Sequence, residues 1–134
     1  MPARHEKFGF APHLMLDGYE CAPQKLADPD FIFETLDKLI PRLKLDKLLP
    51  PSVFSCHDKN GGVGVSGVVL AADAHITLHT FSDKRHLFVD IFSTRDFNAE
   101  EAAEYLAKIF EAGRHETQIL SRGIVEGTNA GPAF

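Results

Sequence analysis

The stretch that decides the fold runs from Gly62 to Asp83 and reads Gly-Val-Gly-Val-Ser-Gly-Val-Val-Leu-Ala-Ala-Asp-Ala-His-Ile-Thr-Leu-His-Thr-Phe-Ser-Asp. Its β-branched and aromatic residues form two runs, Val63 to Ala71 and Ala74 to Phe81, with a short break between them. Such runs favour strands, and a short break favours an antiparallel connection. His86 to Phe92 is a third run of this kind, so the middle of the chain predicts an antiparallel meander.

A helix is predicted on each side of the meander. Asp28-Pro29 begins the first, with Asp as N-cap and Pro at the first helical position, and Pro41 ends or kinks it. Asn98 caps the second, with Glu101 at the reciprocal capping-box position and Gly113 as the left-handed stop. Apolar residues at helical spacing are expected to line one buried face of the first helix: Phe33, Leu36, Leu39, Ile40 and Leu43.

The remaining segments complete an α+β pattern. Pro12 to Glu20 and His115 to Ser121 are expected as the first and last strands, and Leu45 to Cys56 as a loop plus strand or an edge strand. This order predicts a two-layer α/β sandwich with a mostly antiparallel sheet and two main helices on one face. We expect a single domain over residues 1–134, with 1–9 and 124–134 loosely ordered.

Composition narrows the class of protein. The net charge of -5, with scattered Lys and Arg, argues against a nucleic-acid partner, and no apolar run has the length needed to cross a bilayer. The N-terminus carries no apolar segment typical of secretion, and Cys21 and Cys56 are expected to be reduced, so we expect a cytoplasmic protein. Several strands carry apolar residues on both faces, and a homodimer would hide the face that the helices leave uncovered.

Two local patterns have alternative interpretations. Gly62, Gly64 and Gly67 have the spacing of a dinucleotide-binding fingerprint, but a strand follows them where that fingerprint needs a helix, so this function is excluded. His75 and His79 lie four residues apart in a strand and point to the same face. They could share a metal ion that His57 or His13 would help to hold, although a structural zinc site would normally add cysteines or a carboxylate.

The same stretch resembles the core motif of the small prokaryotic S-adenosylmethionine decarboxylases. That motif reads Gly-Val-Ser-Gly-Val-Val, a short spacer, Glu-Ser-His, three residues, and His-Thr-Trp-Pro-Glu. Ser66 matches the serine of Gly-Val-Ser-Gly, which helps processing, and His79 matches the histidine that assists it. Asp83 stands where the family has a ligand-contacting Glu, and Phe81-Ser82 replaces Trp-Pro.

The resemblance extends over most of the chain and differs at the cofactor. His13-Leu14, Tyr19-Glu20-Cys21 and Asp90-Ile91-Phe92 match further family elements. In the family, the serine of Glu-Ser-His cuts its own chain and becomes a pyruvoyl cofactor, but here Asp73 and Ala74 occupy the Glu-Ser positions. A methyl group has no oxygen to attack the preceding carbonyl, so no cofactor is expected in this chain.

The family's catalytic cysteine, a proton donor, is replaced by Thr94, and a hydroxyl is a far weaker acid than a thiol. The resemblance therefore implies a relative of enzymes of polyamine (spermidine) biosynthesis that is not self-processed and lacks decarboxylase activity. It implies catalytic positions at Ala74, His79, Ser66 and Thr94, and ligand-binding positions at Asp83, Phe81, Asp73 and His75. The expected ligand is a small molecule such as S-adenosylmethionine or a polyamine.

Two alternatives stay open. If Ala74 is an engineered replacement of serine, the protein would be an active decarboxylase of S-adenosylmethionine or of an amino acid. Otherwise His75 and His79, with Asp73 or Asp90, could serve as acid-base groups or metal ligands in an enzyme of different chemistry.

Overall fold

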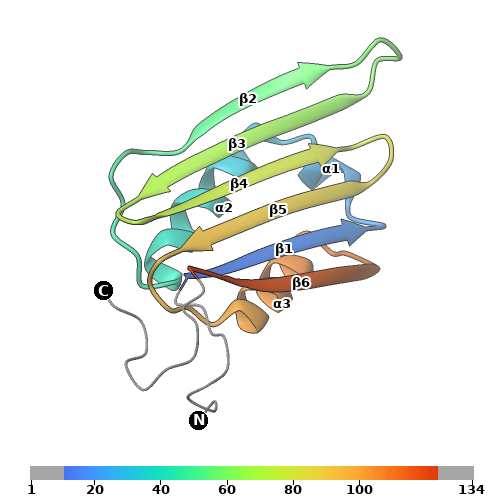
Figure 1. Cartoon of the computed structure of the whole chain (residues 1–134). Helices are drawn as coiled ribbons and strands as arrows, with labels where there is room; N and C mark the ends of the chain where they lie inside the picture. The colour runs from blue at the N-terminus through green and yellow to red at the C-terminus, as the bar shows by residue number, and fades with distance from the viewer. Residues whose placement is uncertain (1–10, 124–134) are drawn as a thin grey trace, which may run out of the picture.

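Alternation of buried and more exposed side chains along the central strands gives the sheet two unlike faces. The structure, a computed structural model, describes residues 11–123, so the expectations for 1–9 and 124–134 lie outside the described residues. The described strands are β1 (Ala11–Tyr19), β2 (Ser52–His57), β3 (Val63–Ala71), β4 (Ala74–Phe81), β5 (His86–Ser93) and β6 (Arg114–Arg122). They pair antiparallel in the order β2-β3-β4-β5-β1-β6 (Figure 1).

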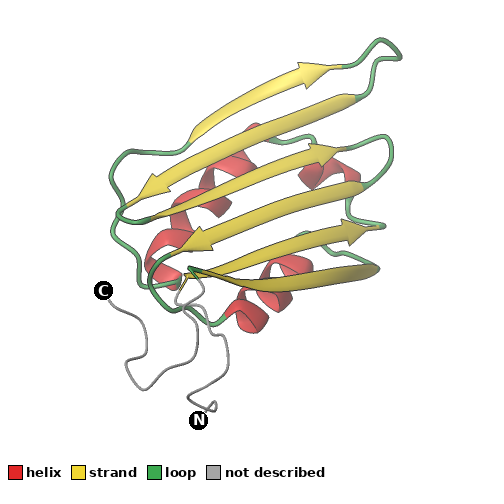
Figure 2. Ribbon diagram, in the orientation of Figure 1, coloured by secondary structure: helices red, strands yellow, loops and turns green. Residues whose placement is uncertain are grey.

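The helices described are α1 (Pro23–Leu26), α2 (Pro29–Arg42) and α3 (Ala99–Ile109), and all lie on the same side of the sheet (Figure 2). The predicted α+β two-layer sandwich is confirmed. The four residues of α1 were not predicted, because a single turn without a capping side chain has no periodicity to recognise. The Leu45-to-Cys56 segment proves to be both a loop and an edge strand, since β2 lies at the end of the sheet.

Aliphatic side chains fill the space between the sheet and the helices. Val65 and Val69 of β3 alternate with partly or more fully exposed neighbours, and the same two-residue period holds along β4 and β5. The sheet contributes these fully buried aliphatic residues: Leu14, Ile76, Leu78, Leu87 and Ile91. Ile32, Leu36 and Leu39 of α2 and Leu106 of α3 complete the core from the other layer.

Two close contacts hold the layers together. A side chain at Gly67 would place its Cβ 2.6 Å from Cδ1 of Leu36, so the missing side chain lets α2 approach β3 closely. The buried Thr80 hydroxyl donates to the carbonyl oxygen of Leu26 at 2.6 Å and accepts from the backbone N–H of Val65 at 3.0 Å. This hydroxyl therefore ties the end of α1 to two neighbouring strands.

Several local expectations were wrong in detail. Phe33 is 38% exposed, because the buried face of α2 is rotated toward Ile32 and Thr35. The left-handed residue after α3 is Glu111, with φ of 55°, and not Gly113. Asn98 caps α3 as predicted, accepting from the N–H of Glu101 at 3.0 Å, but the carboxylate of Glu101 pairs with Arg42 at 3.2 Å.

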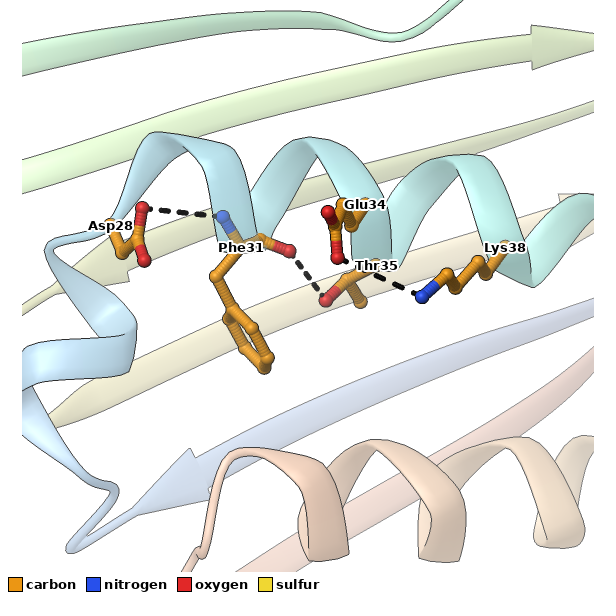
Figure 3. Close-up of polar contacts among 5 residues, drawn as sticks. All are labelled: Asp28, Phe31, Glu34, Thr35 and Lys38. Atoms are coloured by element: carbon orange, nitrogen blue, oxygen red, sulfur yellow. Dashed lines mark hydrogen bonds and ion pairs between the residues drawn. The ribbon is translucent and has the colours of Figure 1, made fainter.

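Helix α2 begins at the cap that the sequence indicates and ends at Arg42, one residue after Pro41. Oδ1 of Asp28 accepts from the backbone N–H of Asp30 at 3.0 Å. It also accepts from the backbone N–H of Phe31 at 3.3 Å (Figure 3). On the exposed side of the helix, Glu34 and Lys38 form an ion pair of 3.7 Å, one turn apart. The cap provides an acceptor for N–H groups of the first turn, which have no hydrogen-bond partner within the helix. The ion pair, by contrast, is exposed and therefore screened by solvent.

These two contacts predict different losses. Asp28→Ala should lower the free energy of unfolding by about 1 kcal/mol, because two helix N–H groups lose their acceptor. Glu34→Ala, the matched control on the same helix, should change it by less than about 0.5 kcal/mol. Urea denaturation followed by circular dichroism measures both, and equal losses would contradict the assigned role of the cap.

Candidate functional site

The predicted catalytic positions fall into two groups. Ala74 and Thr94 lie at the β3–β4 turn, whereas Ser66 and His79 form a pair farther along the same two strands. Ala71 of β3 pairs with Ala74 of β4, and Ser66 pairs with His79. The two pairs are therefore five residues apart along each strand, or about 17 Å. The groups do not meet within one chain.

The β3–β4 turn presents the peptide between Asp73 and Ala74 to Thr94. Asp73 has a left-handed backbone with φ of 61°, a conformation that Asp tolerates better than most residues. Its carbonyl oxygen accepts from the backbone N–H of Thr94 at 3.0 Å and from the Thr94 hydroxyl at 3.4 Å. Two donors on one carbonyl oxygen would stabilise negative charge there.

The side chain of Ala74 points to the helix-covered face and is 5% exposed, beside its strand partner Ser93. The Ser93 hydroxyl accepts from the backbone N–H of Arg95 at 2.8 Å. The residues at this turn are therefore packed and hydrogen-bonded. The methyl group of Ala74 adds neither an oxygen atom nor an exchangeable proton to them.

The second group lies on the face of the sheet that carries no helix within residues 11–123 (Figure 2). We call this the open face. Oγ of Ser66 is 2.8 Å from Nδ1 of His79, and the pair borders a hollow of about 140 Å³. Phe54, Val68 and Thr77 line the same hollow, which is mostly apolar. A hydroxyl next to an imidazole can exchange a proton, and the apolar wall can accept a flat or aliphatic group.

The predicted ligand-binding residues are also distributed. His75 and Phe81 share the open face with His79, where the His75 ring lies 5.5 Å from that of Phe92 and the Phe81 ring 5.9 Å from that of Phe88. Asp83 lies in the β4–β5 turn beside Gly62. Asp73 belongs to the other group.

The geometry argues against a metal ion shared by His75 and His79. Four residues along an extended strand separate their Cα atoms by about 13 Å, because such spacing brings side chains together on a helix but not on a strand. Within the part of the chain that the structure describes, no three His, Cys, Asp or Glu side chains are placed to hold a metal.

A second, larger hollow contains none of the predicted site residues. It has a volume of about 530 Å³ and lies between the end of α2 and the start of α3, lined by Arg42, Lys44 and Asn98 among others. Arg42 already pairs with Glu101 and lies 3.8 Å above the ring of Tyr105. Because its main cation is neutralised in this way, we assign no chemistry to this hollow.

The two cysteines occupy unlike places. Cys21 is buried and Cys56 is exposed on β2, and both are free. Burial raises the pKa of the Cys21 thiol to about 11, and the nearby Arg85 guanidinium offsets this only in part. At neutral pH Cys21 is therefore held as an unreactive thiol.

Comparison with known proteins supports the resemblance. The profile of the S-adenosylmethionine decarboxylase family matches residues 12–123. The chain belongs to this family. None of the helices described between residues 11 and 123 is long and apolar enough to cross a membrane.

Relatives and a solved structure agree with this assignment. The S-adenosylmethionine decarboxylase proenzyme of Geobacillus kaustophilus is 31% identical over 112 residues, covering 84% of this chain and 86% of the relative. The proenzyme of the same name from Pyrococcus furiosus is 30% identical over 116 residues, covering 85% and 79%. The crystal structure of the adenosylmethionine decarboxylase from Aquifex aeolicus superimposes with a TM-score of 0.68 at 25% identity, covering 92% of this chain and 97% of that one.

The buried state of Cys21 gives a direct test. In a Cys56→Ser variant, the single remaining thiol should resist Ellman's reagent at about pH 8 and react only after unfolding in concentrated guanidinium chloride. The raised pKa leaves little thiolate, and burial keeps the reagent out. Rapid reaction of the folded variant would show that the position of Cys21 is assigned wrongly.

Proposed function

We propose that this chain is an S-adenosylmethionine decarboxylase-like protein that stays uncut, forms no pyruvoyl group and binds a small cationic or nucleoside-like metabolite as a cytoplasmic homodimer. It would act in polyamine metabolism as a binding or regulatory protein. One observation carries the proposal: the residue after the Asp73 carbonyl is an alanine, although Thr94 still holds that carbonyl.

The chemistry of the turn supports the loss of self-cleavage. Cleavage would begin when a side-chain oxygen attacks the Asp73 carbonyl carbon and forms an oxyanion. Collapse of this oxyanion would then transfer the acyl group from the backbone nitrogen to the side-chain oxygen. Two donors from Thr94 suit such an oxyanion. Ala74 has no atom that can attack, so the residues present do not fit a pyruvoyl group.

The open face supports a small ligand. The Ser66–His79 pair supplies a donor and an acceptor beside an apolar hollow. Beyond the strand ends, Asp58 of the β2–β3 turn and Asp83 of the β4–β5 turn approach the same point, with their Oδ2 atoms 2.6 Å and 3.0 Å from where a Cβ on Gly62 would lie. An exposed pair of carboxylates suits a positively charged group of a ligand, and the apolar hollow suits a flat or aliphatic group.

The same face supports a second copy as partner. Large apolar side chains stand exposed on it: Phe54, Val68, Leu70, Phe81 and Leu120. Six strands spaced about 4.8 Å apart and about eight residues long give a face of roughly 750 Å². This is close to the ~800 Å² per subunit that a specific dimer buries. A second copy would also supply the groups that one chain keeps about 17 Å apart.

The mass of the intact protein tests the proposal most directly. The purified wild-type chain should give one species of about 14.8 kDa, and a hydrazide reagent should find no ketone on it. Incubation with S-adenosylmethionine should release no carbon dioxide above background. Cleavage between Asp73 and Ala74 into two fragments, the second with a keto-acyl group at its N-terminus, would overturn the proposal.

A serine substitution separates the missing nucleophile from the rest of the site. Ala74→Ser should divide the chain slowly into two fragments on a denaturing gel, because the Asp73 carbonyl keeps both donors. In the Ala74→Ser, Thr94→Val double variant cleavage should be at least about tenfold slower, since one donor is gone. An intact band in the single variant would show that more than the nucleophile has been lost.

Calorimetry tests the ligand. S-adenosylmethionine or spermidine should bind the wild-type protein, and Asp83→Asn should weaken binding by about tenfold or more by removing a charged partner. Asp30→Asn, an equally exposed change on α2, is the matched control and should have no effect. If neither compound binds, only a scaffold role is left for this chain.

A further inference from the structure

We infer that protonation of histidines on the open face switches the dimer, so that the two copies separate as the pH falls from about 8 to about 5. This inference rests on the dimer proposed above. It follows from how the fold distributes histidine: of the six within residues 11–123, four lie on the open face. They are His13 on β1, His75 and His79 on β4, and His86 on β5.

Three of these rings are packed against aromatic neighbours. His13 and His75 lie 6.1 Å and 5.5 Å from the Phe92 ring, and His86 lies 5.2 Å from Tyr19 and 6.1 Å from Phe88, all between ring centroids. The side chains of all three histidines remain partly exposed. A second copy would remove that water, and a charged imidazolium loses much more hydration energy than a neutral ring.

Carboxylates on the open face can neutralise only part of the added charge. The register places Asp90 diagonally across from His13, His75 and His79, and Asp17 diagonally across from His86. Nε2 of His13 is 3.4 Å from Oδ1 of Asp90. One carboxylate cannot serve three histidines, and within residues 11–123 the described ion pairs include none for the other three rings.

The remaining charged groups determine the sign of the effect. On the strands of the open face, leaving aside the turns at their ends, Asp17, Asp90 and Glu116 carry three negative charges, and Arg114 and Arg122 carry two positive charges. With neutral histidines the face carries one net negative charge, and with four protonated histidines it carries three net positive charges. Two identical faces pressed together would therefore repel strongly in acid and weakly near neutral pH.

The tyrosine at the rim does not alter this balance. The pKa of Tyr19 is raised above its usual value of 10.0, first by loss of solvent and then by the Asp17 and Glu116 carboxylates. Its phenol therefore stays neutral over the whole range. His115, by contrast, pairs with the buried Gly18 and so belongs to the helix side of β6, away from the proposed interface.

The size of the effect follows from proton linkage. A histidine that takes up a proton in the monomer at about pH 5 and must be neutral in the dimer weakens association on the order of 30-fold. A symmetric interface contains each residue twice, so a single such position gives about a 1,000-fold increase in the dimer Kd.

Sedimentation velocity of the full chain at about pH 8, 6.5 and 5 tests the inference. The wild-type protein should be dimeric at about pH 8 and monomeric at about pH 5, with an unchanged far-ultraviolet circular dichroism spectrum. A variant with His75→Gln, His79→Gln and His86→Gln should stay dimeric at both values. His115→Gln, the matched control on the other side of the sheet, should keep the wild-type pH dependence.

The outcomes separate the two proposals. A monomer at every pH would overturn the dimer and this inference with it. A dimer whose Kd is the same at about pH 8 and 5 would leave the dimer standing and overturn the histidine switch alone. Dissociation that occurs only together with loss of the circular dichroism spectrum would also overturn the switch. In that case the His86→Gln substitution alone should not shift the pH midpoint of dissociation.

Discussion

Burial of one face of an alternating sheet against two helices is the constraint on which the molecule depends. Each strand from β3 to β5 puts aliphatic residues toward α2 and α3 and the intervening residues toward the open face. A shift of one residue in register would exchange the two sets, which would expose the core and bury histidines and carboxylates. Because that exchange is so costly, the register is fixed, and with it the position of every candidate functional residue.

The same constraint explains why the candidate site is divided. Ala74 takes an inward position next to the turn, where its methyl group packs under the helix layer. Ser66 and His79 take outward positions opposite each other on β3 and β4, and therefore meet at 2.8 Å. The rigid pairing that joins Ser66 to His79 also keeps both of them far from the turn. A site that needed both groups would require a second chain, and the open face is the surface that could receive one.

What stays at the turn is a carbonyl held by two donors without a nucleophile. The left-handed backbone of Asp73 and both contacts from Thr94 come from hairpin geometry and from the end of β5, so a methyl group at Ala74 does not disturb them. Scaffold and chemistry are separable in this fold, because backbone pairing maintains the first and one side-chain atom decides the second.

The sequence by itself determined the strands of the meander, the caps Asp28 and Asn98, the α+β architecture and the absence of an attacking oxygen at Ala74, because these depend on local periodicity and on the chemistry of single residues. Tertiary structure alone decided that Ser66 and His79 lie far from Ala74 and Thr94, that Phe33 faces outward, that Glu111 is the left-handed residue after α3, and that Glu101 pairs with Arg42. Those outcomes depend on strand pairing and helix rotation, which join residues far apart in the chain, and local sequence patterns carry no information about distances of that kind.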